Sequence, residues 1–203
     1  MELESYVNSG KIRALYPLLK SWINTNLEYL EYFDTPDCSW WYNERATLST
    51  FAAAIWKVNG IALEEYSIEK SKNHEFWSGR CDLFFGLQSD QFACESKQTW
   101  CPIGKTAKNG VVNVKNSLRE ACNDAKKLPK EEGRRLGLCF AVPFLPDRDE
   151  ELIESQLEEW LKKLCQCVEY DAISWLFPEI IRYKIKTMDG YFYPGVVMII
   201  KEI

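Results

Sequence analysis

The sequence predicts an α/β fold in which a central mixed sheet of about five strands is flanked by helices. Helical segments with one apolar face alternate with short apolar runs typical of strands. The chain has 203 residues, of which 46% are hydrophobic, and this length fits one domain with a well-filled core. Because no repeat, low-complexity segment or linker divides residues 1–203, we expect a single α/β domain.

Two helices open the predicted order of elements. In residues 11–33, apolar side chains recur on one helical face. A second helix begins after Asn43, a residue type suited to an N-cap, and ends at Asn59-Gly60, where glycine favours termination.

A meander, a helix and a further strand are predicted next. The meander comprises residues 61–70, 80–86 and 91–98. Residues 111–128 carry an apolar stripe at helical spacing, and residues 135–145 are apolar almost throughout, as in a strand covered on both faces. A helix with an acidic start and late strands follow in residues 146–203.

Composition excludes several classes of protein. No stretch approaches 18 apolar residues, so we expect no membrane span, and the first residues lack the pattern of a secretory signal. The eight cysteines contain no CxxC pair, and several lie in apolar strand-like runs. Buried free thiols in a cytoplasmic protein are therefore expected, rather than a disulfide scaffold or a structural zinc site.

Charge is distributed unevenly along the chain. The net charge is −5, yet residues 105–135 hold nine basic and four acidic side chains, which gives this segment +5 and leaves −10 for the rest. A solvated helix face would explain this excess equally well as a nucleic-acid contact. Under the second interpretation, the contacts to a phosphate backbone would come from Lys105, Lys108, Lys115 and Arg119.

The predicted hairpin at residues 79–100 contains charged side chains that its apolar face does not explain. If the turn is centred between Gln88 and Ser89, Asp82 faces Glu95 across the two strands, with Cβ atoms about 5 Å apart. Period two places Lys97 on the same face as Glu95. Two carboxylates in this arrangement repel each other unless they share a proton or bracket a cation.

A further carboxylate heads the helix that follows Asn43. Glu44 begins a stripe with Leu48, Phe51 and Ile55 at spacings of four, three and four, so it lies on the side that faces the core. A lone glutamate here would simply complement the helix dipole. Its position on the inward stripe also makes it a candidate member of the acidic cluster.

Such a cluster suits phosphodiester hydrolysis. Asp82 and Glu95 are hard oxygen ligands for Mg²⁺ or Mn²⁺, and a bound metal polarises a phosphoryl oxygen and activates water. A lysine beside the metal, here Lys97, orients the attacking water and stabilises the charge that develops on the phosphate.

The pattern resembles the PD-(D/E)xK nuclease superfamily, which has the restriction-endonuclease-like fold. In that family a helix, a three-stranded meander, a helix and a further strand carry an Asp in the second strand and an acidic-x-Lys run in the third. Here Asp82, residues 95–97 (Glu-Ser-Lys) and the helix acid Glu44 match, over about residues 43–145. The proline expected before the first Asp is absent, and Cys81 stands in its place.

The resemblance implies a metal-dependent nuclease, a hydrolase that acts on DNA, or alternatively RNA, by attack of metal-activated water. Its catalytic residues would be Glu44, Asp82, Glu95 and Lys97. No separate sequence-reading module is apparent, so specificity would come from the structure of the nucleic acid, from a homodimer or from a partner protein.

Two alternatives remain open. Asp82 could form a structural ion pair with Lys97 or Arg80 in an inactive binding module. The chain could also be a nuclease-fold subunit that works only with a partner protein.

Overall fold

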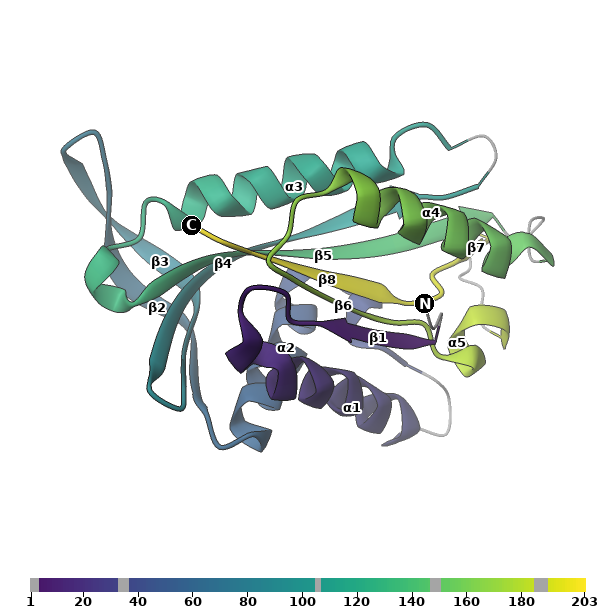
Figure 1. Ribbon diagram of the computed structural model, residues 1–203, viewed down its shortest axis with the longest axis horizontal. Helices are drawn as coiled ribbons and strands as arrows, with labels where there is room; N and C mark the ends of the chain where they lie inside the picture. The colour runs from purple at the N-terminus through teal and green to yellow at the C-terminus, as the bar shows by residue number, and fades with distance from the viewer. Residues whose placement is uncertain (1–3, 33–36, 105–106, 147–150, 185–189) are drawn as a thin grey trace.

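The computed structural model describes residues 4–32, 37–104, 107–146, 151–184 and 190–203, and in them a mixed sheet is covered by helices on both faces (Figure 1). The strands are β1 (Ser5–Asn8), β2 (Ile61–Lys72), β3 (Glu75–Leu87), β4 (Asp90–Pro102), β5 (Arg134–Pro146), β6 (Ala172–Leu176), β7 (Tyr191–Phe192) and β8 (Val196–Glu202). The α-helices are α1 (Tyr16–Tyr32), α2 (Glu44–Lys57), α3 (Gly110–Ala125), α4 (Ile153–Cys167) and α5 (Glu179–Lys184). Within these residues no helix is long and apolar enough to cross a membrane.

The strands follow the order β1-β6-β8-β5-β4-β3-β2, and β7 pairs with β5 outside this path. All neighbours are antiparallel except β4 and β5, which are parallel and joined by a crossover that contains α3. The predicted α/β class with a mixed sheet flanked by helices is therefore confirmed.

The predicted number of about five strands was wrong, because the described residues form eight. β1 has only four residues, too few for a periodic pattern, and it is held by pairing with β6. The C-terminal apolar run is divided at Pro194-Gly195 into β7 and β8. Residues 71–78, predicted as a connector, instead extend β2 and β3 to a tight turn in which Asn73 and His74 both have positive φ.

Two core layers enclose the sheet. α1 and α2 pack on one face, where the apolar stripe of α2 meets Leu83, Phe85 and Phe92. α3 and α4 cover the other face, and α3 and α4 lie together above β5 and β8 in Figure 1. All eight cysteines have free thiols, and five of them are buried: Cys38, Cys81, Cys94, Cys101 and Cys139.

Local sequence signals set the ends of the helices beside the candidate site. The Asn43 side chain accepts a hydrogen bond from the Ala46 amide at 3.1 Å, so the predicted N-cap of α2 is confirmed. α2 ends before Asn59, which has a φ of 60°, as the predicted Asn-Gly stop requires. Glu44 thereby becomes the first residue of α2 and faces the sheet.

Gly137 allows α3 to lie close to β5. A Cβ at this position would stand 2.7 Å from the Cys122 sulfur and 2.8 Å from the Cys122 amide nitrogen. We expect Gly137→Ala to lower the free energy of unfolding by about 1–3 kcal/mol, because helix backbone would have to move. Urea denaturation measures this change.

The matched control is Gly86→Ala on β3. There the new methyl group would meet only the Ile61 side chain, which is exposed and can move. We expect a change within about 1 kcal/mol. Equal losses in the two variants would contradict the close packing of α3 on Gly137.

Candidate active site

The candidate site lies where β3 and β4 separate. Their pairing runs from Leu87↔Asp90 to Leu83↔Cys94, which confirms the predicted turn between Gln88 and Ser89. The ladder ends one pair before Asp82 and Glu95, so these two residues are not a ladder pair as expected. Instead, Asp82 Oδ2 accepts a hydrogen bond from the Ser96 amide at 2.8 Å and lies 3.3 Å from the Ser96 hydroxyl.

The backbone is also irregular on the other side of Asp82. The register with β2 passes from Glu64↔Leu83 to Tyr66↔Cys81 and omits the pair between Glu65 and Asp82. Glu65 has a φ of 54°, which costs free energy for a residue with a side chain. Residues held in such conformations cluster at functional sites, so the distortion around Asp82 supports a site here.

Ser96 links two carboxylates from different elements. Its side chain lies on the α2 face of β4, where the hydroxyl donates to Glu44 Oε1 at 2.9 Å. The Gln98 amide donates to the other oxygen, Oε2, at 3.0 Å. The structure therefore brings Glu44 and Asp82 together at Ser96, although Glu44 precedes Asp82 by 38 positions.

Glu95 and Lys97 alternate with Ser96 and lie on the α3 side of the sheet. Glu95 is only 3% exposed, and its Oε1 lies 2.7 Å from Lys70 Nζ on β2. That contact is ionic, since the two atoms are not aligned for a hydrogen bond. Lys97 Nζ donates to the Ser96 carbonyl oxygen at 2.8 Å and lies 3.4 Å from Asp124 of α3.

Electrostatics couples these groups into one cluster. Burial raises the pKa of Glu95 to about 7; the Lys70 ammonium opposes this shift, and the negative charge of Asp82 adds to it. Burial also raises the pKa of Glu44 above its ordinary value. Burial alone would lower the pKa of Lys97, but the negative charges of Glu44, Asp124 and Asp82 outweigh it and raise that pKa.

If Asp82 were purely structural, it would pair with Lys97 or Arg80, but those two side chains have other ion-pair partners. The ion-pair partner of Lys97 is Asp124, and Arg80 pairs with Glu65 at 3.4 Å. Asp82 instead takes its hydrogen bonds from Ser96.

The donor set suits a hard cation such as Mg²⁺. Asp82 and Glu95 supply carboxylate oxygens, and Glu95 Oε1, although 2.7 Å from Lys70 Nζ, has no aligned hydrogen-bond donor among the described residues. Within the described residues, no three His, Cys, Asp or Glu side chains are grouped as a metal site. Mg²⁺ is commonly held by one or two carboxylates, with water and substrate phosphates completing its shell, so a pair meets its needs.

No family model matches this chain, and no curated protein or solved structure is detectably similar to it. The assignment of the site therefore depends on its geometry.

The predicted nucleic-acid contacts do not gather at this cluster. Lys105 lies outside the described residues. Lys108 is exposed and lines a separate cavity near the start of α3. Lys115 and Arg119 are exposed on α3. At a rise of 1.5 Å per residue, they precede Asp124 by about 13 Å and about 8 Å along the helix axis.

Three residues of the cluster were missed in the sequence. Lys70 lies in a predicted strand with no predicted partner, Asp124 lies in a predicted amphipathic helix, and Ser96 is the variable residue of the acidic-x-Lys run. Only the period-two alternation of β4 signalled Ser96, because it places that side chain toward the helix that carries Glu44.

The pKa of Glu95 makes the stability of the metal-free protein depend on pH. Because this pKa lies above its ordinary value of 4.5, folding favours the protonated form. That contribution is complete below about pH 4.5 and is lost as the pH rises through about 7. Between about pH 5 and pH 8 we expect the parent protein to lose stability as Glu95 ionises. Glutamine does not titrate, so Glu95→Gln should lose less free energy of unfolding over this range, by on the order of 1–2 kcal/mol. Urea denaturation with a chelator present measures this difference.

Glu159→Gln provides the control for that measurement. Lys163 lowers the pKa of this exposed glutamate, so it stays charged throughout the window and its replacement leaves the pH dependence unchanged. A Glu95→Gln variant that loses as much stability as the parent protein over the same window would show that Glu95 is ionised throughout.

Proposed function

We propose that this protein is a metal-dependent nuclease with a restriction-endonuclease-like core, acting on DNA or alternatively RNA. The observation that carries the proposal is the meeting of Glu44, Asp82 and Lys97 around Ser96, at the point where β3 and β4 separate. Glu95 precedes Ser96 in β4 and lies close enough to Asp82 for that charge to raise the Glu95 pKa. The order α2, β2, β3, β4, α3, β5 also agrees with the element order of the PD-(D/E)xK superfamily. A cytoplasmic location fits the buried free thiols and belongs to this proposal.

The roles of the residues follow from their positions. Asp82 and Glu95 would hold Mg²⁺ or Mn²⁺, which when bound polarises the scissile phosphate and activates water. Glu44 accepts hydrogen bonds from Ser96 and Gln98, so it orients the strand that carries the metal ligands. Lys97 would orient the attacking water and stabilise negative charge on the phosphate as a cation.

One observation favours the alternative of an inactive nuclease-fold binding module or partner-dependent subunit. Lys70 and Asp124 already neutralise Glu95 and Lys97, so the cluster has internal charge partners without a metal. Under that alternative, Mg²⁺ or Mn²⁺ leaves the melting temperature unchanged. Under the nuclease proposal, binding to the folded state raises it.

The direct test of the nuclease proposal is cleavage of plasmid DNA and of single- and double-stranded DNA and RNA oligonucleotides with Mg²⁺ or Mn²⁺. We expect Asp82→Asn and Lys97→Ala each to lower the cleavage rate by about 10²–10⁴-fold, because each removes a group that acts on the reacting phosphate or its metal.

Glu158→Gln and Lys162→Ala match these two changes on the exposed surface of α4 and should cleave at the parental rate. Undiminished cleavage by both Asp82→Asn and Lys97→Ala would exclude this site. If no nucleic acid is cut and calorimetry detects no metal binding, the inactive module is the better description.

Ser96→Ala tests how the carboxylates are positioned. Asp82 keeps the Ser96 amide as a donor, but Glu44 and Asp82 lose their shared hydroxyl. We expect about a tenfold lower cleavage rate with little change in the KM for the oligonucleotide, as for other residues that orient metal ligands. Thr47→Ser, which keeps the hydroxyl that donates to Gln98, is the control; equal losses in both variants would contradict the role of Ser96.

A further inference from the structure

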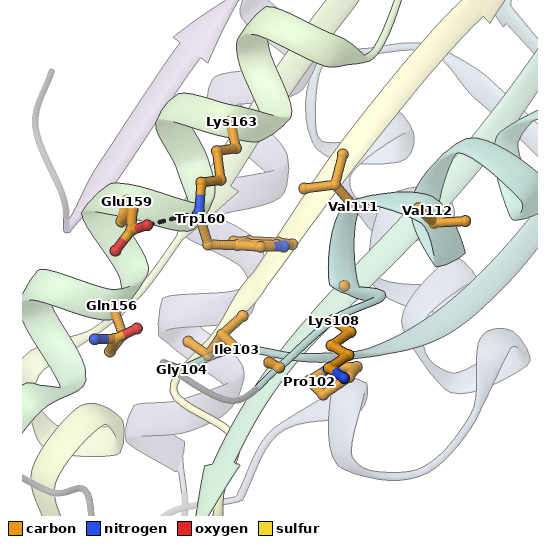
Figure 2. A pocket seen from close by; sticks show the side chains of 12 residues that line it. Pro102, Ile103, Gly104, Lys108, Val111, Val112, Gln156, Glu159, Trp160 and Lys163 are labelled. Atoms are coloured by element: carbon orange, nitrogen blue, oxygen red, sulfur yellow. Dashed lines mark hydrogen bonds and ion pairs between the residues drawn. The ribbon is translucent and has the colours of Figure 1, made fainter.

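A small cavity lies at the opposite end of α3 from Asp124, between the start of α3 and α4. Its volume is about 170 Å³, large enough for several waters or one phosphate-sized anion. Figure 2 shows side chains from the end of β4, the start of α3 and one face of α4 around it. None of the four candidate catalytic residues lines this cavity, and Ser96 does not line it either.

The first amides of α3 lie beside this cavity and have no acceptor within the helix. The first intrahelical bond runs from the Asn113 amide to the Asn109 carbonyl oxygen, so the amides of Gly110, Val111 and Val112 have no intrahelical acceptor. The Asn109 side chain does not cap them. These three amides and the helix dipole favour a negative charge at this position.

A buried indole adds an independent donor. Trp160 of α4 is only 5% exposed, and its Nε1 is buried without a hydrogen-bond partner. In Figure 2 this nitrogen points toward the start of α3. A Cβ at Gly110 would stand 3.2 Å from Nε1, so the glycine keeps the indole and the first turn of α3 close together. A buried N–H without an acceptor is unfavourable, and an anion in the cavity would supply the missing acceptor.

The charged residues around the cavity leave it positive. Lys108 and Lys163 both line it, and the only carboxylate in its described lining, Glu159, is paired with Lys163 at 2.6 Å. Gln156, which is 8% exposed, adds an amide that makes no side-chain hydrogen bond to another described residue. Hydrogen-bond donors from both helices therefore surround the cavity. They are more numerous than the two oxygens of a carboxylate ligand would use.

We propose that this cavity binds a phosphate group. The amides at the start of α3 and the indole of Trp160 contact the phosphate oxygens, and Lys108 supplies a positive charge that forms no ion pair with another described residue. The phosphate belongs either to a free phosphate monoester, such as a mononucleotide, or to the backbone of a nucleic acid. The proposal does not depend on the nuclease proposal, because the two sites share no residue.

The test follows the indole N–H of Trp160 by ¹H–¹⁵N NMR of the full chain. The chain has eight tryptophans, and the Trp160 resonance is the one that disappears in Trp160→Phe. Inorganic phosphate at millimolar concentration, added at constant ionic strength, should shift this resonance downfield in a saturable manner. The exposed indoles of Trp56 and Trp77 should not follow.

Two comparisons define the site and the source of the phosphate. Lys108→Met should weaken phosphate binding by about two- to fivefold, as expected for an exposed charge, whereas Lys162→Met, which lies outside the cavity, should not. An oligonucleotide without terminal phosphates that shifts the Trp160 resonance identifies a backbone phosphate. A response to a mononucleotide but not to that oligonucleotide identifies a free monoester.

A Trp160 resonance that phosphate does not move, or that moves together with those of Trp56 and Trp77, would overturn the proposal. Neither outcome bears on cleavage, since this measurement needs no metal and no activity.

Discussion

The structure around the candidate site depends on one hydrogen bond, in which the Ser96 amide donates to Asp82. Beyond Leu83↔Cys94 the strands β3 and β4 no longer pair, and the Ser96 amide would lose its acceptor inside the sheet. An unsatisfied buried amide costs about 1–3 kcal/mol, and the Asp82 carboxylate removes that cost at 2.8 Å. A charged residue in an apolar strand thus takes the place of a backbone carbonyl, and the opening between the strands becomes a stable feature.

That opening explains how four charged groups share a mostly buried position. Ser96 donates to Glu44 and Asp82, while Lys70 and Asp124 compensate the charges of Glu95 and Lys97. Removing Lys70 would leave Glu95, which is only 3% exposed, without its opposite charge, and an unpaired buried charge is costly. Apolar residues would fill the same space at lower cost, and this is why we propose a ligand, rather than stability of the fold, as the reason for the cluster.

Sequence patterns predicted the parts of this site that depend on local periodicity. The polar turn at Gln88-Ser89 set the register, period two placed Glu95 with Lys97, and helical spacing turned Glu44 toward the sheet. The separation of the strands could not be predicted. It depends on whether the folded sheet leaves an amide beside Asp82 without a backbone acceptor. Lys70 and Asp124 lie 25 residues before and 29 after Glu95, and only the packing of β2 and α3 brings them near it. Similarly, β1 is too short to show a pattern and exists as a strand because β6 offers it an edge.

Helix α3 connects the two sites through its dipole. Its C-terminal end, where partial negative charge accumulates, lies beside Lys97 and Lys127, both of which pair with Asp124. Its N-terminal end, about 24 Å away for 16 residues, carries amides without an intrahelical acceptor beside the cavity that Trp160 lines. Cations therefore gather at one end of the helix and the proposed phosphate site lies at the other, as the dipole favours. Gly137 and Gly110 keep α3 close to β5 and to Trp160, so the position of this single helix sets the geometry of both sites.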